Sequence, residues 1–256
     1  MRARPDGFAG RSFWIVGASS GIGAALAREF SRRGAEVAIS ARRVDDLLDV
    51  ARDEMAVVPC DVTDRTAVLA AAGEVGASVG GPDVVVWSAG YWDRFDAAAW
   101  DADAFARHVE VNLLGLNNLL AAVLPGMVRA RGGHLVAIAS VAGYRGLAGA
   151  EAYGATKAAQ LNLLEGLRAA LRRYGVRVTT VSPGFVRTPM TRDNDFPMPF
   201  IVEPEEAALA IVEGLRRRRT EIVFPLPMAI LMKTARVLPV RAWAALSGRA
   251  AGRGAR

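Results

Sequence analysis

The chain is poor in residues that form disulfides or bind metals. Cys60 is its only cysteine, so no intrachain disulfide can form. His108 and His134, the only histidines, lie far apart in the sequence, and no cluster of potential metal ligands accompanies them. We therefore predict no metal site. So few thiols are typical of a reducing compartment, and we expect a cytoplasmic location.

Long apolar runs and linkers are also missing. No stretch reaches the ~18 apolar residues of a membrane-spanning helix. The basic residues 1–11 precede only a short apolar run, 13–16, which is not typical of a signal peptide. We find no repeat and no Pro/Gly/Ser-rich linker. With 256 residues, 52% of them hydrophobic, we expect one globular domain.

The formal net charge is +6, which by itself would permit binding to nucleic acid. The arginines are spread along the chain, however, and denser groups occur only at 216–219 and in the tail. No nucleic-acid-binding motif is present. We therefore predict no nucleic-acid partner.

Short apolar runs alternate with longer segments of helical periodicity. Continuous apolar strands separated by helices predict parallel strands that are buried on both faces. The fold class is therefore α/β, a Rossmann-type doubly wound parallel sheet of seven strands with helices on both faces. The expected strands are 13–16, 36–40, 56–60, 83–87, 134–139, 176–181 and 221–224. The expected helices are 22–33, 45–54, 66–77, 102–131 with a bend at Pro125, 153–174 and 205–217.

Ligands of such sheets bind beyond the carboxyl ends of the strands. The first strand is followed by "GASSGIG", with Gly17, Gly21 and Gly23, and then by a helix. Glycines allow close approach of a pyrophosphate, and the helix N-terminus supplies free N–H groups. A tight turn without a ligand is the alternative. The position between strand and helix favours a dinucleotide site.

The second strand ends in "SARR", where an NAD-preferring site usually has an acidic residue. No carboxylate follows until Asp45, and Arg42 and Arg43 stand there instead. A guanidinium suits a 2′-phosphate in charge and in geometry. We expect NADP(H) to be preferred, with NAD(H) as the alternative if both arginines are merely solvated.

Further motifs follow in order along residues 10–225: "CDVTD", "SAG", "VNLLG", "IASVAG", "YGATK" and "SPGFVRT". Together with the glycine motif, they resemble those of the short-chain dehydrogenase/reductase family, in its shorter single-domain form. Val16 and Ser88 depart from residues that are frequent there, Thr and Asn. Because those residues mainly brace the turn and the sheet, we expect some lost local hydrogen bonding and unchanged chemistry.

The resemblance implies a catalytic set and a dinucleotide site. Tyr153 would be the general acid/base, Ser140 would donate to the same oxygen, and Asn112 would hold a water that links Lys157 to solvent. The catalytic residues implied are Asn112, Ser140, Tyr153 and Lys157. The cofactor residues implied are Gly17, Ser19, Ser20, Gly21, Ile22, Gly23, Arg42, Arg43, Asp61, Val62, Ala89, Gly90, Tyr153, Lys157, Pro183, Gly184, Val186 and Thr188.

Lys157 is unusual in its residue type, because only it and Lys233 are lysine among 32 basic residues. Tyr153 and Lys157 are four apart on a predicted helix and so share a face. We expect the ammonium to favour the phenolate and to lower the pKa of Tyr153 from its usual ~10. The compact ammonium could also reach a ribose hydroxyl. A surface lysine at helical spacing is the alternative.

The predicted substrate segment, 188–204, is rich in Met and Phe, which line adaptable apolar pockets. We expect a lipophilic ketone or secondary alcohol as the small-molecule substrate. Ordinary core packing could account for about half of these residues. The residues considered are Met190, Phe196, Met198, Phe200 and Ile201, with Tyr91, Trp92, Phe95 and Tyr144 from neighbouring loops.

Residues 226–246 form an apolar and basic extension of the same domain, with a helix expected at 229–246 that is interrupted near Pro239. Peripheral contact with a membrane surface is one expectation. The alternatives are a helix over the cleft or one in a subunit interface. We expect a disordered tail at 247–256, and the family resemblance implies a homodimer or homotetramer.

The function predicted is an NADP(H)-dependent carbonyl reductase or alcohol dehydrogenase. A non-catalytic dinucleotide-binding sensor and an NAD-linked alcohol dehydrogenase remain as alternatives. Sensors commonly lack part of the Ser, Tyr and Lys set, which is complete here. An epimerase or dehydratase fits poorly, because few residues remain for a sugar-binding domain.

Overall fold

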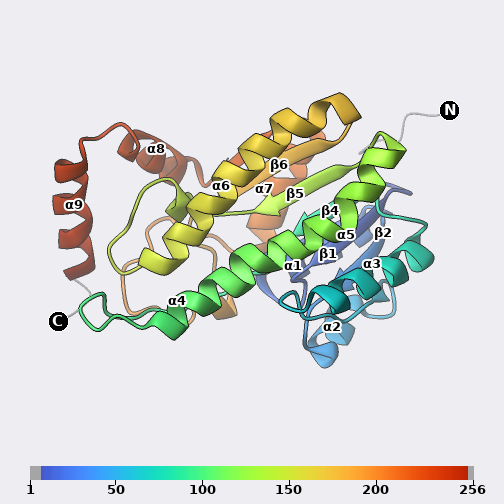
Figure 1. The fold of residues 1–256 in the computed structure, drawn as a ribbon, viewed down its shortest axis with the longest axis horizontal. Helices are drawn as coiled ribbons and strands as arrows, with labels where there is room; N and C mark the ends of the chain where they lie inside the picture. The colour runs from blue at the N-terminus through green and yellow to red at the C-terminus, as the bar shows by residue number, and fades with distance from the viewer. Residues whose placement is uncertain (1–6, 253–256) are drawn as a thin grey trace.

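A parallel sheet forms the centre of the molecule in the computed structural model, which describes residues 7–252 (Figure 1). The strand order is β3-β2-β1-β4-β5-β6-β7, and every pairing is parallel. This confirms the predicted doubly wound sheet. The strands are β1 (Ser12–Val16), β2 (Glu36–Ser40), β3 (Ala56–Val57), β4 (Val84–Trp87), β5 (His134–Ile138), β6 (Arg177–Pro183) and β7 (Glu221–Phe224).

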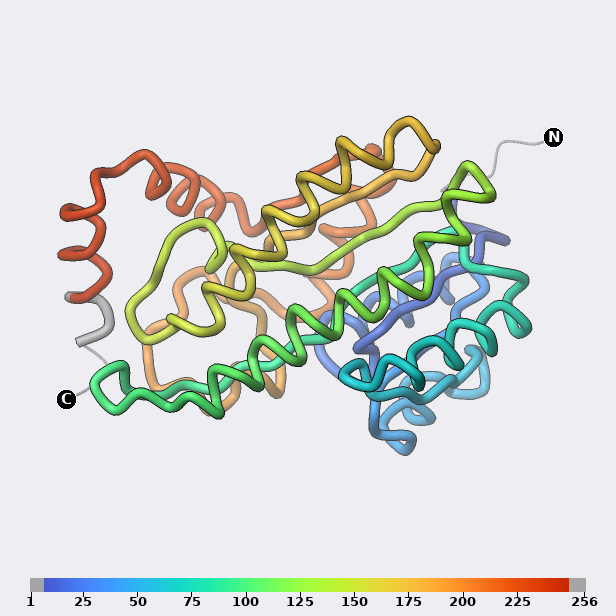
Figure 2. The backbone as a smooth tube through the Cα atoms, in the orientation of Figure 1, coloured from blue at the N-terminus to red at the C-terminus, as the bar shows by residue number. Residues whose placement is uncertain are grey.

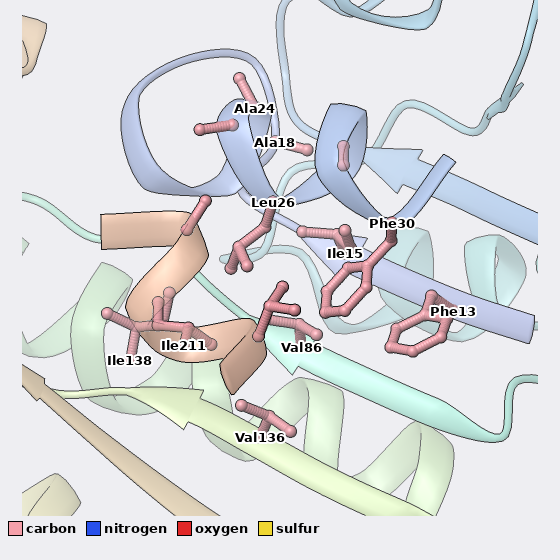
Figure 3. Close-up of a cluster of buried hydrophobic side chains, with 14 of the residues drawn as sticks. Phe13, Ile15, Ala18, Ala24, Leu26, Phe30, Val86, Val136, Ile138 and Ile211 are labelled. Atoms are coloured by element: carbon pink, nitrogen blue, oxygen red, sulfur yellow. The ribbon is translucent and has the colours of Figure 1, made fainter. Parts of the chain in front are cut away.

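Helices cover both faces of the sheet. The helices that pack on it are α1 (Gly21–Arg32), α2 (Val44–Ala51), α3 (Arg65–Val79), α5 (Gly115–Ala130), α6 (Glu151–Leu171) and α7 (Pro204–Arg216). Buried residues of α1, α2 and α7 form one core with the sheet, and those of α3, α5 and α6 form the other. The first core contains Phe13 stacked on Phe30, with ring centres 4.1 Å apart (Figure 3).

The strands bury both of their faces, as continuous apolar runs predict. Every residue of β1, β4 and β5 is buried. The register pairs Val16 with Ser40 on one side and with Trp87 on the other, so neighbouring strands end at the same level. The loops that follow β1, β2 and β4 therefore meet at one edge of the sheet.

The long helical run at 102–130 is interrupted at a different place from the one expected. It consists of α4 (Ala102–Val109), the π-helical segment η1 (Glu110–Leu114) and α5, and Pro125 lies inside α5. Contrary to the expectation from the sequence, this run is long and apolar enough to cross a bilayer by length and composition. Its Leu116 and Leu119 are fully buried against the sheet, as in a core helix.

Two strand boundaries differ by more than one residue from those predicted. β3 stops at Val57 instead of residue 60, although the backbone N–H groups of Val58 and Cys60 still donate to the carbonyl oxygens of Ile39 and Ala41 beside it. β6 continues through Pro183 and pairs with Phe224 of β7. Short 3₁₀ turns complete the fold: η2 (Val141–Gly143), η3 (Arg172–Tyr174) and η4 (Pro189–Thr191).

The C-terminal extension is two helices, not one. α8 (Leu226–Ala235) and α9 (Val240–Gly252) are separated near Pro239, where a break was expected. α9 lies at one side of the molecule, and α8 joins it to the end of β7, against which it packs (Figure 1). The helix extends through Gly252, so residues 247–252 of the predicted disordered tail are helical. Residues 253–256 of that tail lie outside the described residues.

Candidate active site

A cleft of about 270 Å³ lies at the carboxyl ends of the strands. It collects loops from β1, β2, β4, β5 and β6. Nearly all of the predicted site residues line it. They are Gly17, Ser19, Ser20, Gly21, Ile22, Arg42, Arg43, Asp61, Val62, Ala89, Gly90, Ser140, Tyr153, Lys157, Pro183, Gly184, Val186 and Thr188.

The turn after β1 requires its glycines. Gly17 has φ +89°, and a Cβ on it would lie 2.3 Å from the backbone nitrogen of Ala89. Gly21 has φ +56° and faces Thr188, whose Cγ2 would lie 2.9 Å from an added Cβ. Gly23 does not line the cleft. It packs against Gly17, whose carbonyl oxygen would lie 2.2 Å from its Cβ.

Helix α1 begins in this turn with its N-terminus uncapped by any side chain. Ser20, the N-cap residue, makes no side-chain capping hydrogen bond, and the first turn contains no acidic residue. Free N–H groups and the helix dipole favour an anion at this position. The turn therefore fits the pyrophosphate of a dinucleotide.

The two arginines after β2 differ in their contacts. Arg43 forms an ion pair with Asp46 of α2. Arg42 is exposed, lines the cleft and has no ion-pair or hydrogen-bond partner for its side chain among residues 7–252. Asp61, on the next loop, accepts hydrogen bonds from the backbone and hydroxyl of Thr63 at 2.9 and 2.8 Å. Arg42 is thus the guanidinium open to an incoming phosphate.

Ser140 and Tyr153 lie next to each other in the wall of the cleft. Ser140 follows β5, and its hydroxyl accepts a hydrogen bond from Ala142 N at 3.1 Å. Tyr153 lies in the first turns of α6. Burial raises the pKa of Tyr153 to about 12, and hydrogen bonding with Ser140 offsets part of that rise. The phenol therefore carries its proton at neutral pH.

Lys157 follows one turn later on α6 and is almost fully buried. Its Nζ donates to the carbonyl oxygen of Ile138 and to Oε1 of Gln160, both at 3.1 Å. Burial lowers the pKa of Lys157 to about 7.

The expected lowering of the pKa of Tyr153 by Lys157 does not occur in this structure. Burial of the phenol dominates, and both hydrogen bonds of the ammonium are directed to other groups. The Nζ of Lys157 still lies within 5.5 Å of the centre of the Tyr153 ring. The predicted pair is therefore adjacent, with a protonated phenol beside a lysine that titrates near neutrality.

Asn112 lies behind the cleft wall in η1 and does not line the cleft. Its amide is engaged on both sides. Oδ1 accepts from Tyr91 N at 2.7 Å, and Nδ2 donates to Tyr91 O and to Oγ1 of Thr156, both at 3.0 Å. Asn112 thus joins the loop after β4 to α6, beside Lys157.

The loop after β4 and the predicted substrate segment, 188–204, run side by side (Figure 2). Trp92 donates from Nε1 to Asn194 at 3.0 Å, and Arg94 forms an ion pair with Asp195 at 2.5 Å. The ring of Trp92 packs edge-to-face on Tyr153, with centres 5.4 Å apart. These contacts place an aromatic wall next to Tyr153.

The other predicted pocket residues divide between cleft and core. Met190 lines the cleft, whereas Phe200 is exposed on the surface. Tyr144 is buried under α8 with Met228 and Met232, and its hydroxyl donates to Glu221 at 2.7 Å. Additional cleft residues not predicted are Ala41, Cys60, Ser88, Val111, Ile138, Ala139 and Thr191. For five of them the position at or just after a strand end was a signal in the sequence, whereas Val111 lies in η1 and Thr191 in η4.

Across residues 7–252, no three histidine, cysteine or carboxylate side chains gather into a group that could hold a metal ion.

Comparison with known proteins identifies the family of this chain. The chain matches the family model for short chain dehydrogenases over residues 12–196. An uncharacterized oxidoreductase of Myxococcus xanthus is 39% identical over 236 residues, which cover 90% of this chain and 93% of that protein. One from Staphylococcus saprophyticus is 33% identical over 210 residues, 79% of this chain and 90% of that protein.

Solved structures show the same fold. A short-chain dehydrogenase from Streptomyces avermitilis superposes with a TM-score of 0.75 at 27% identity, covering 88% of this chain and 92% of that one. The apo form of LigD from Sphingobium sp. strain SYK-6 has a TM-score of 0.78 at 27% identity, with coverage of 89% and 94%. The chain belongs to the short-chain dehydrogenase family. It is an oxidoreductase of that family, whose members use nicotinamide dinucleotides.

Proposed function

We propose that the protein is an NADP(H)-dependent carbonyl reductase or alcohol dehydrogenase that acts on a lipophilic ketone or secondary alcohol. One observation carries this proposal: Ser140, Tyr153 and Lys157 line the same cleft as the glycine turn after β1. A dinucleotide in the turn and a carbonyl beside Tyr153 can therefore occupy one continuous space.

The residues of the cleft fit a nicotinamide dinucleotide. The uncapped N-terminus of α1 would hold the pyrophosphate, Asp61 the adenine side, and Arg42 the 2′-phosphate. Lys157 would bind the ribose, with Pro183, Gly184, Val186 and Thr188 near the nicotinamide and pyrophosphate. When bound, the reduced dinucleotide supplies a hydride to the carbonyl carbon.

Tyr153 and Ser140 carry the proton chemistry in this proposal. A phenol with a pKa of about 12 is protonated at neutral pH and can donate its proton to a carbonyl oxygen that gains negative charge. Ser140 donates a hydrogen bond to the same oxygen, which stabilises that charge as it develops. The ring of Trp92 packs on one side of the phenol ring. Alcohol oxidation would need Tyr153 as a base and is therefore favoured at alkaline pH.

The preference for a lipophilic substrate is supported by the walls beside Tyr153. Trp92 packs on the phenol ring, Met190 borders the cleft, and Phe185 and Phe196 lie near each other, with ring centres 6.1 Å apart. Among these groups, the charged Arg94 is already paired with Asp195. Apolar walls with few free charges suit a hydrophobic ketone.

Titration of the purified protein with NADPH and NADH, followed by nicotinamide fluorescence, tests the cofactor. Tight NADPH and weak NADH binding supports the proposal, and a screen of hydrophobic ketones then follows NADPH oxidation at 340 nm. Equal or NADH-favoured binding instead indicates an NAD-linked alcohol dehydrogenase. Binding without turnover of any ketone or alcohol indicates a sensor, and binding of neither nucleotide refutes the enzyme.

We also propose that α8 and α9 contact an anionic membrane surface peripherally. Leu226 and Ile230 are exposed and four residues apart on α8, and Val237 is exposed in the turn that follows this helix. From Leu226 to Arg256 the sequence has six basic residues and no Asp or Glu. An apolar face with only positive charges around it complements anionic lipid. A homodimer or homotetramer in the cytoplasm stays a prediction, and light scattering of the purified protein tests the oligomeric state.

A further inference from the structure

Gln160 is the only glutamine in the chain and is fully buried on α6, one turn after Lys157. A buried primary amide is costly unless its donor and its acceptor both find partners. In Gln160 both the amide oxygen and the amide nitrogen have a hydrogen-bond partner. Its Oε1 accepts a hydrogen bond from Lys157 at 3.1 Å, and its Nε2 donates to the backbone carbonyl of Asn112 at 2.6 Å.

These two bonds join three residues that belong to two elements. Lys157 and Gln160 belong to α6, and Asn112 belongs to the π-helical segment η1, which lies beside α6. A second bond across the same contact runs from Nδ2 of Asn112 to Oγ1 of Thr156 at 3.0 Å. The family resemblance implies a water between Asn112 and Lys157. In this chain a side-chain amide connects the Asn112 backbone directly to the ammonium.

The surroundings of the Lys157 ammonium are otherwise sparse. β5 provides the carbonyl of Ile138, and α6 provides the amide oxygen of Gln160. Tyr153 is the ionisable neighbour, on α6 itself. Burial lowers the pKa of Lys157, and no carboxylate contributes to this shift. Buried ammonium groups are usually paired with a carboxylate. Here a neutral amide holds the ammonium in place and leaves it free to lose its proton.

We propose that Gln160 is a positioning residue that fixes the Lys157 ammonium between β5 and α6 and anchors it to η1. The role of Lys157 in binding the ribose and supporting Tyr153 rests on the proposed function. The contact between Lys157 and Gln160 does not depend on the proposed function. A missing amide would free Nζ to rotate about its four-carbon stem, so both its protonation and its reach towards the cleft would change.

The chain has only two lysines, so ¹³Cε-lysine labelling gives two NMR signals, and the exposed Lys233 is an internal reference. The midpoint for Lys157 is expected near pH 7 in the wild-type protein. Gln160→Met, similar in size, removes an acceptor of the ammonium and should lower the midpoint by about 1 unit. Gln160→Glu places a carboxylate there and should raise it by about 1–3 units.

NADPH titration is the second measurement. Gln160→Met should bind NADPH about five-fold more weakly, equivalent to one ordinary hydrogen bond. Thr179→Val is the matched control, because it removes a buried hydroxyl that bonds His134 and the Arg219 carbonyl, away from the cleft. Thr179→Val should leave the titration midpoint of Lys157 and the affinity for NADPH unchanged. Its loss of thermal stability then shows what a purely structural effect looks like.

An unchanged Lys157 midpoint in both Gln160 variants would overturn the inference, as would equal shifts in Thr179→Val. If Gln160→Met does not fold, Gln160→Glu still decides the result through the direction of its shift. The lysine titration needs no nucleotide. A wild-type protein that binds neither nucleotide would refute the proposed function and leave the test of Gln160 intact.

Discussion

The Nζ of Lys157 lies 5.5 Å from the centre of the Tyr153 ring, yet it donates to Ile138 and Gln160 instead of to the phenol. The two groups therefore share a wall of the cleft without a direct hydrogen bond. Burial moves their pKa values in opposite directions, up to about 12 for Tyr153 and down to about 7 for Lys157. In both cases the neutral form gains, since burial disfavours charge.

Tyr153→Phe should lower the rate of ketone reduction by at least 10²–10⁴-fold, about the contribution of a general acid. The ring and its packing on Trp92 remain, so NADPH affinity should be nearly unchanged. Single-turnover rates and fluorescence titrations measure the two quantities separately. Retention of full activity by this variant would show that another group provides the proton.

Arg42→Ala should weaken NADPH binding by roughly 10–100-fold, the equivalent of a lost hydrogen bond to a charged group, and should leave NADH binding unaffected. Arg43→Ala is the matched control, because the Arg43 side chain is paired with Asp46. Its effect should be several-fold smaller. Titrations of the three proteins with both nucleotides, at one salt concentration, check this. The reverse order of effects would assign the 2′-phosphate to Arg43.

Gly17→Ala should destabilise the protein strongly and abolish nucleotide binding. Its Cβ would lie 2.3 Å from Ala89 N, on a residue with φ +89°. Gly73→Ala, inside α3 and with nothing within 4 Å of the added Cβ, should instead stabilise by up to ~1 kcal/mol. Urea unfolding of both variants gives the comparison. A fully stable, nucleotide-binding Gly17→Ala protein would rule out the tight turn described here.

His134 should make the protein sensitive to acid. Burial, followed by the charges of Arg177 and Arg11, lowers its pKa to about 3 from an ordinary value of 6.5. Between those pH values the unfolded chain binds a proton that the folded chain does not. The contribution of His134 to the free energy of unfolding should therefore fall by about 1.4 kcal/mol for each pH unit of acidification within this window.

The variant His134→Gln isolates that contribution. Its unfolding free energy, measured with urea at pH 7, 6, 5 and 4.5, should decline less steeply than that of the wild type by about this slope. Parallel curves for the two proteins would mean that His134 is already protonated, or exposed, in the folded state.

Ile230→Asp should reduce binding to vesicles that contain phosphatidylglycerol, because Ile230 is 60% exposed on α8 and its substitution introduces a negative charge. Leu209→Asp is the matched control on α7, where Leu209 is 50% exposed and far along the chain from the extension. Sedimentation with anionic and with neutral vesicles measures this. Wild-type protein that stays in the supernatant with both vesicles would contradict membrane contact. A loss of oligomer in Ile230→Asp would assign the face to a subunit interface.

Much of the fold could be predicted because local pattern determines it. Short apolar runs rich in β-branched and aromatic residues, such as those of β1 and β4, favour buried strands, and the helices between them give parallel connections. The β7 boundaries at 221–224 coincide with those predicted. The η1 interruption could not be predicted in this way, because it depends on how Asn112 bonds to Tyr91 and Thr156 after the chain has folded.

The sequence alone determined the succession of strands and helices along the chain, the glycine turn after the first strand and the spacing of Tyr153 and Lys157, since these depend on local pattern and helical period. Only the tertiary structure decided which arginine is paired with a carboxylate, where Gln160 directs its amide, and that burial raises the pKa of Tyr153. Those properties depend on groups distant in sequence and on exclusion of water, which arise only when the helices pack on the sheet.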